Sequence, residues 1–134
     1  MHPDRRFDLL AGGLMAIPLL AGFALWTELP ARVAIHWSAS GPDTFVAKPV
    51  AIVGLFLFGL GTIAFVRLAP HSMTNTPGGK NVTVLFLGVV FAWVHGMVVV
   101  WNLGYHFSVS LAVFPVLILA GGLVVYAMWG GSIR

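Results

Sequence analysis

The chain has 134 residues, of which 59% are hydrophobic and 8% are charged, and its formal net charge is +3. Soluble domains carry about 25% charged residues, so this composition excludes an ordinary water-soluble core and favours a protein that crosses a membrane several times. In such a protein a small excess of Lys and Arg is typical of cytoplasmic loops and does not indicate nucleic acid binding. The lack of cysteine excludes disulfides, thiolate zinc sites and cysteine nucleophiles.

Four long apolar stretches predict four transmembrane helices after a short polar lead. Their expected ranges are about 9–26, 49–68, 82–101 and 107–129. Glycines inside these stretches would let the backbones of neighbouring helices approach closely. The sequence therefore predicts an all-α membrane protein with a single domain, residues 1–134, folded as a bundle of four transmembrane helices.

The distribution of basic residues predicts how the helices are oriented in the cell membrane. Basic residues occur in the polar lead, just before the connector 69–81 at Arg67, within it at Lys80, and at the last residue of the sequence. The loop between the first two helices carries Arg32 and Lys48, and the loop between the last two carries no Lys or Arg. By the positive-inside rule both termini and the connector are cytoplasmic, and the segment between the first two helices faces the exterior. Arg67, at the end of the second helix, is expected to extend into the lipid headgroups.

Residues 28–48, ELPARVAIHWSASGPDTFVAK, concentrate polar chemistry between the first two apolar stretches. Their ionisable residues are Glu28, Arg32, His36, Asp43 and Lys48. The run 33–37 is β-branched and aromatic, as in a short strand, and the run 40–43 has the composition of a turn. The sequence therefore predicts an ordered, hairpin-like extracytoplasmic loop folded over the bundle. The apolar side chains expected to pack downward are Ile35, Trp37 and Phe45.

The same loop resembles the SdpI-like integral membrane family. The matching residues are Leu29-Pro30, Val33, Ile35-His36-Trp37, Gly41-Pro42-Asp43 and Lys48, in the order of the family's LP…IP.H….G.PD….K loop. That loop belongs to an N-terminal domain of unknown function. The resemblance implies a multispanning protein of the cytoplasmic membrane that, in the best-known members, gives immunity to a secreted toxin peptide and relays its presence to a membrane-bound repressor. Ala34 replaces the family's second proline, and the sequence lacks the C-terminal SdpI portion.

Several residues of the loop are candidates for binding a ligand or partner, namely His36, Trp37, Gly41, Pro42, Asp43 and Lys48. Histidine offers a pH-sensitive contact or a hydrogen bond to a ligand, or it simply ties the loop together through Asp43. The aspartate is equally explained as a turn residue, and the tryptophan and lysine as anchors at the membrane interface. A metal needs three or four convergent ligands, for which the weak candidates are Glu28, His36, Asp43 and His106.

Two polar residues of the third helix, His95 and Asn102, form a second candidate site. They are seven residues apart, so they share one face of a helix. Ionisable groups inside a membrane are costly and point to function, although a single hydrogen bond to another helix would also satisfy a neutral histidine. No Asp or Glu lies deep in an expected helix, so a proton relay is not expected.

The motifs of enzymes are absent from the sequence, which contains no activated-nucleophile, HExxH or phosphate-loop pattern, and we expect no catalysis and no cofactor. The leading hypothesis is a small membrane protein that binds or senses an extracytoplasmic ligand, such as a toxin-like peptide, through the 28–48 loop, in immunity or signal relay. Its connector 69–81 would face a membrane or cytoplasmic protein partner, and a homo-oligomer is compatible with the pattern. The alternatives are an accessory subunit or assembly factor of a larger membrane complex and, more weakly, a small transporter or channel.

Overall fold

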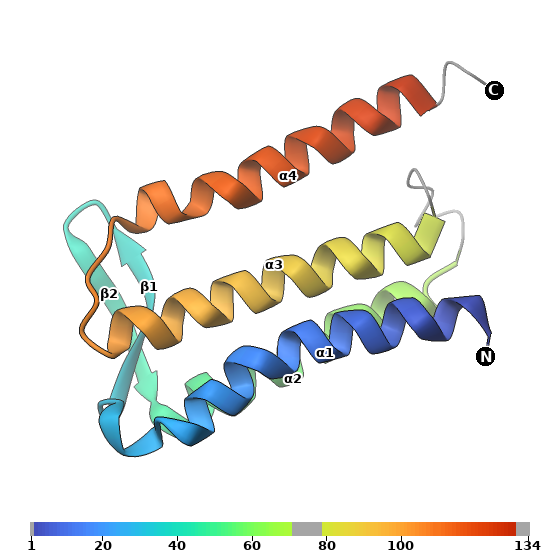
Figure 1. Ribbon diagram of the computed structural model, residues 1–134. Coiled ribbons are helices and arrows are strands. Elements are labelled where there is room, and N and C mark those ends of the chain that lie inside the picture. The colour runs from blue at the N-terminus through green and yellow to red at the C-terminus, as the bar shows by residue number, and fades with distance from the viewer. Residues whose placement is uncertain (1, 71–78, 131–134) are drawn as a thin grey trace.

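The computed structural model describes residues 2–70 and 79–130 of the chain, except for the side chains of residues 127 and 130. The elements are α1 (Pro3–Ala24), the 3-10 helix η1 (Trp26–Glu28), β1 (Arg32–Ser38), β2 (Gly41–Ala47), α2 (Lys48–Leu68), α3 (Gly79–Asn102) and α4 (Val109–Gly130). Within the described residues four helices are long and apolar enough to cross a membrane, which confirms the predicted all-α, four-helix class. The start of α1 and the end of α4 lie at one end of the molecule and the hairpin β1–β2 at the other (Figure 1).

The first helix begins earlier than the apolar stretch, because the polar lead is itself helical. Pro3 lies in the first turn, where its missing N–H costs nothing, and the ring nitrogen Nδ1 of His2 accepts a hydrogen bond from the backbone N–H of Asp4 at 3.4 Å. Asp4 also lies near the positive end of the helix dipole. Hydropathy alone places the start near residue 9, since it weighs the fit to lipid and not the capping of the helix.

Helices α1, α2 and α3 form the packed part of the molecule. Helices α1 and α3 approach closely at Gly88, where an added Cβ would lie 2.7 Å from the Cα of Ala11. Only glycine allows this distance, in the way expected of small residues at membrane helix contacts. One core cluster lies around this point and consists of Ala11, Met15, Ile63, Val66 and Val84.

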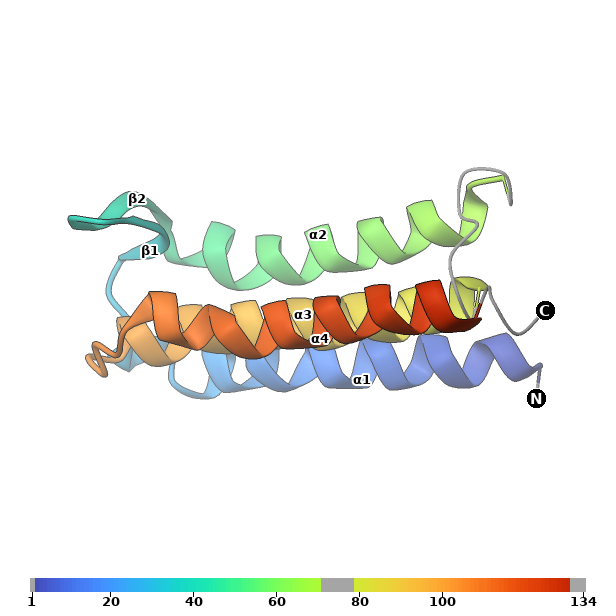
Figure 2. The same ribbon diagram turned by 90° about the horizontal axis from the view of Figure 1, so that it is seen from above.

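Helix α4 lies beside α3 and apart from the other two helices (Figures 1 and 2). None of the residues in its membrane-spanning window is buried, whereas between 22% and 28% are buried in the windows of the other three helices. Its apolar side chains cover every face, and lipid is as apolar as they are, so no hydrophobic force draws the helix into the bundle. The predicted four transmembrane helices therefore form a packed group of three with the fourth alongside α3.

The segment between α1 and α2 is a two-stranded antiparallel hairpin. The register runs from Arg32 opposite Ala47 to Ser38 opposite Gly41, with irregularities on both sides of His36. The turn lies at residues 39–40, and Gly41 follows it with a φ of +115°, a conformation that favours glycine. The turn expected at 40–43 is therefore displaced, and Pro42 and Asp43 belong to strand β2.

The packing of the hairpin differs from the prediction at one aromatic residue. Ile35 and Trp37 are partly buried against a core cluster formed by Val33, Ala51 and Val98, as expected. Phe45 is 43% exposed, which corrects the expectation that it packs downward. Successive side chains of a strand point to opposite faces, and the next residue, Val46, is the one packed against the cluster.

Candidate functional site

Asn102, the last residue of α3, holds the hairpin on the bundle. Its Oδ1 accepts a hydrogen bond from the backbone N–H of Ala34 at 2.9 Å, and its Nδ2 donates to the carbonyl oxygen of the same residue at 2.9 Å. Nδ2 also donates to the carbonyl oxygen of Val98 at 2.7 Å. The side-chain amide thus pairs with β1 as the backbone of a neighbouring strand would. Ala34 is fully buried, so no water can replace these bonds.

Lys48, at the start of α2, is a structural residue at the base of the hairpin. Its backbone N–H donates to the carbonyl oxygen of Ala31 at 2.9 Å, and its Nζ donates to that of Trp26 at 2.7 Å. The Nζ also lies 5.2 Å from the centre of the Trp26 ring, a distance typical of a cation–π contact. The lysine therefore joins η1 to α2 through its side-chain ammonium group.

His36 and Asp43 form the polar pair that the hairpin presents to its surroundings. Nδ1 of His36 lies 2.7 Å from Oδ1 of Asp43, and the two side chains are 67% and 40% exposed. Thr44 donates its hydroxyl to the same carboxylate oxygen at 2.9 Å. The hydrogen bonds from His36 and then from Thr44 lower the pKa of Asp43 below its ordinary range. The carboxylate is therefore held in its charged form in a fixed position.

A titration tests the cause of this shift. Because the pKa of Asp43 is lowered, its contact with His36 is present at neutral pH and is lost only as the pH falls through that lowered value. We expect His36→Ala to move the pKa of Asp43 upward, as measured by NMR of the labelled side-chain carboxyl in a membrane mimetic. Ser38→Ala serves as the control, since the Ser38 hydroxyl bonds Ser40 and the carbonyl of Gly41. An unchanged pKa in His36→Ala would contradict this assignment.

The other three candidate residues of the loop are Gly41, Pro42 and Trp37, and each has a structural role in the hairpin. Gly41 supplies the positive φ after the turn, and Pro42 lies opposite Trp37 in the register. Trp37 contacts Trp101 edge to face, with ring centres 5.4 Å apart. His106 stacks on Trp101, with ring centres 4.1 Å apart. The linker between α3 and α4 therefore joins the hairpin through aromatic contacts.

The four metal candidates do not come together as a ligand set. Within residues 2–70 and 79–130 no group of three or more His, Asp or Glu side chains could hold a metal ion. Glu28 lies in η1 and His106 stacks on Trp101, so only the pair His36–Asp43 is formed. The sequence placed these residues on the same side of the membrane but not within coordination distance of one another.

His95 and Asn102 do not form one intramembrane site. His95 is 3% exposed, and its Nε2 is buried without a hydrogen-bond partner. The amide of Asn102 is used on Ala34 and Val98, at the hairpin. Both residues do lie seven positions apart in α3. The sequence could not show, however, that the side-chain amide of Asn102 forms hydrogen bonds with β1.

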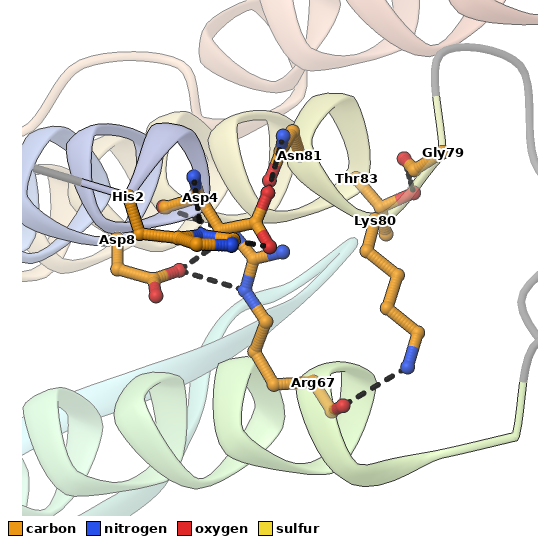
Figure 3. A network of polar contacts seen from close by, with 8 residues as sticks. All are labelled: His2, Asp4, Asp8, Arg67, Gly79, Lys80, Asn81 and Thr83. Atoms are coloured by element: carbon orange, nitrogen blue, oxygen red, sulfur yellow. Dashed lines mark hydrogen bonds and ion pairs between the residues drawn. The ribbon is translucent and has the colours of Figure 1, made fainter.

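A polar network at the opposite end of the bundle joins three helices (Figure 3). Arg67 of α2 donates from Nε to Oδ1 of Asp8 in α1 at 2.8 Å, and its second contact to that oxygen is 2.7 Å. Asn81 of α3 donates from Nδ2 to Oδ1 of Asp4 in α1 at 2.9 Å. Lys80 donates from Nζ to the carbonyl oxygens of Arg67 and Ala69, at 2.9 and 2.6 Å, and so caps the end of α2.

This network was not predicted from the sequence. Arg67 was expected to extend into the headgroups, but its side chain is only 20% exposed and pairs with Asp8. A signal was present, because Asp4 and Asp8 are one helical turn apart and lie at the same membrane level as Arg67. Most of the connector 69–81, proposed as a partner surface, lies outside the described residues, and its described residues Lys80 and Asn81 bond within the bundle.

Comparison with known proteins found a similarity in the first half of the chain. A model of the family described as a domain of unknown function (DUF1648) matches residues 13–60. This range runs from α1 through the hairpin into α2 and covers less than half of the chain. No curated protein and no solved structure matches the chain significantly. The chain thus has the fold of a four-helix membrane protein, and its hairpin region is similar to this domain of unknown function.

Proposed function

We propose that the protein binds or senses an extracytoplasmic ligand through the hairpin β1–β2. The observation that carries this proposal is the contrast between the base of the hairpin, which is fixed to the helices, and its polar pair His36–Asp43, which is exposed. The side-chain amide of Asn102 makes two hydrogen bonds to the backbone of Ala34 in β1, and Lys48, directly after β2, donates from Nζ to the carbonyl oxygen of Trp26 in η1. Val33 and Ala34 are fully buried. His36 and Asp43 are nevertheless exposed. A rigid scaffold that presents polar groups on a loop is typical of binding sites.

The same geometry supports a relay from the hairpin to the far end of the bundle. The hairpin is joined to α1 through η1, to α2 through Lys48 and to α3 through Asn102. At the other end these helices are joined by the network around Arg67. A ligand that displaces the hairpin would therefore act on all three helices together. The SdpI-like resemblance implies a toxin-like peptide as this ligand, with immunity or signal relay as the outcome and a membrane or cytoplasmic protein as the partner.

A double substitution in the exposed pair tests the binding role. We expect His36→Ala with Asp43→Ala to weaken peptide binding, or the protection of cells against a membrane-active peptide, by about ten- to a hundredfold, as for lost hydrogen bonds to a charged group. Lys48 is kept, because its loss would disturb α2 and η1. Ser40→Ala, in the turn of the same hairpin, is the matched control. Full protection by the double variant at normal protein levels would defeat the proposal.

The exposure of α4 favours a second candidate function. Large apolar side chains on this helix are well exposed, such as Ile118 at 72% and Trp129 at 71%. A helix that lies outside the packed group would suit an accessory subunit or assembly factor of a larger membrane complex. Purification in mild detergent distinguishes the two, because a stoichiometric large partner is expected only for the subunit. A self-contained protein would favour the binding role.

A further inference from the structure

Helices α1 and α3 run in the same direction and pack along one seam with a constant offset. Near their starts, Asn81 of α3 donates a hydrogen bond to Asp4 of α1 at 2.9 Å. Further along, Gly88 of α3 lies so close to Ala11 of α1 that only glycine fits. The two residues of each pair are 77 positions apart, and the second pair follows the first by seven positions. Seven residues make nearly two helical turns, so one more such step leads to the next pair on the same seam.

The next pair on the seam is Pro18 and His95, in the interior of both helices. Pro18 is buried in α1, and His95 of α3 is 3% exposed. The bundle is tightly packed on either side of this pair. Toward the start of the helices α3 touches α1 at Gly88, and toward the hairpin a Cβ added to Gly22 of α1 would lie 2.8 Å from Ile52 of α2. A molecule bound at this level of the seam must therefore be small.

Pro18 leaves one backbone carbonyl of α1 without its helical partner. In an α-helix the N–H of residue 18 would donate to the carbonyl oxygen of Leu14, but proline has no N–H. The carbonyl of Leu14 points along the helix toward Pro18, which lies on the buried side of α1. The oxygen therefore opens toward the seam with α3. Such a group needs a polar partner, because lipid offers none.

A second polar atom without a partner reaches the same place from α3. Nε2 of His95 is buried and has no hydrogen-bond partner among the residues that the structure describes. Side chains of a helix lean toward the turn that precedes their own Cα. The ring of His95 therefore leans from the level of Pro18 toward the level of Leu14. A ring nitrogen and a carbonyl oxygen from two different helices thus both need a partner at this height of the bundle.

We propose that one water molecule is bound between α1 and α3, where it donates to the carbonyl oxygen of Leu14 and is hydrogen-bonded to Nε2 of His95. Buried waters join polar groups that the chain itself leaves unpaired, and a water can donate and accept at once. An ion is disfavoured, because the seam one turn before this pair is formed by the apolar residues Met15 and Phe91. The water takes the place of the direct bond that Nε2 does not make.

This water completes a row of polar contacts along α3. Asn81 bonds α1 at one end of the row, and Asn102 bonds the hairpin at the other. His95 lies between them on the same seven-residue spacing, and the water joins it to α1 in the interior of the membrane. The site is independent of the proposed role of the hairpin, because neither His36 nor Asp43 takes part in it.

Solid-state NMR of the full-length protein in phosphatidylcholine bilayers tests the proposal. With nitrogen-15-labelled histidine, magnetisation should pass from a slowly exchanging water to the ring of His95, whose signal is assigned by its loss in His95→Gln. Pro18→Ala restores the N–H that Leu14 lacks, so the water loses one partner and should exchange about tenfold faster. The matched control is Pro115→Ala, because Pro115 also lies inside a helix but at an exposed position of α4. It should leave the exchange rate unchanged.

A second measurement needs no substitution and gives a result even if Pro18→Ala fails to fold. The carbonyl of Leu14, isotopically labelled by semisynthesis, should absorb in the infrared as a hydrogen-bonded group and should shift when H2O is replaced by D2O. The control is the labelled carbonyl of Leu10, whose helical partner is the N–H of Leu14 and whose band should not shift. The proposal is overturned if the ring of His95 receives no magnetisation from water, if Pro18→Ala leaves the exchange rate unchanged, or if the carbonyl of Leu14 absorbs as a free group.

Discussion

Asn102→Leu is expected to lower the free energy of unfolding by about 2–4 kcal/mol and to release the hairpin from α3. The substitution leaves both the N–H and the carbonyl oxygen of Ala34 buried without partners, and each such group costs about 1–3 kcal/mol. Leucine has the same branched arrangement of four side-chain heavy atoms as asparagine, so the substitution removes the hydrogen bonds and creates no cavity. The measurements are a denaturant titration in detergent and hydrogen exchange at the amide of Ala34, which should lose its protection.

Thr62→Val is the control for this experiment. Thr62 also lies in a helix and donates its hydroxyl to a carbonyl oxygen, but that oxygen belongs to Phe58 of the same helix. Its replacement removes a polar group without touching the hairpin, so stability should change by less than about 0.5 kcal/mol. An amide of Ala34 that stays protected in Asn102→Leu would show that another contact holds β1 on the bundle.

Arg67→Met is expected to destabilise the opposite end of the bundle by about 2–3 kcal/mol, the range of hydrogen bonds to charged groups. The arginine makes two contacts to Asp8, and it also donates to the backbone carbonyl oxygen of Asp4 at 3.4 Å. Its loss leaves the carboxylate of Asp8 without its partner at the end of α1. Denaturant titration measures the loss, and spin labels at the ends of α1 and α2 should report a larger separation.

The exchanged pair Asp8→Arg with Arg67→Asp distinguishes an ion pair from simple packing. We expect it to recover at least part of the stability that either single substitution removes, because the opposite charges again face each other. Arg5→Met, at an exposed position of the same end of α1, should leave stability unchanged. Stability of the exchanged pair no better than that of the single variants would contradict a direct charge interaction.

The sequence predicted well those features that depend on neighbouring residues. Four apolar stretches specify four helices, because a chain in lipid must satisfy its backbone hydrogen bonds within each segment. The β-branched run 33–37 and the turn residues after it likewise indicate a hairpin, which the structure contains. The exposed pair His36–Asp43 followed from the same local pattern, since the two residues are seven positions apart on facing strands.

The sequence pattern could not predict contacts between segments that lie far apart in the chain. Asn102 bonds a strand residue 68 positions away, and Arg67 bonds Asp8 across 59 positions. The exposure of Phe45 depends on which face of β2 meets the cluster around Val33. The position of α4 beside α3 is also a tertiary result, because every face of that helix is equally apolar and gives no preferred partner.

By itself, then, the sequence determined a membrane protein of four helices with a polar hairpin between the first two, since hydropathy and turn chemistry act over a few residues. Only the tertiary structure decided how that hairpin is held, how the far ends of three helices are joined, and that α4 lies beside α3. The physical reason is that a hydrogen bond, an ion pair or a packing contact between helices forms only when remote segments are brought to within a few ångströms.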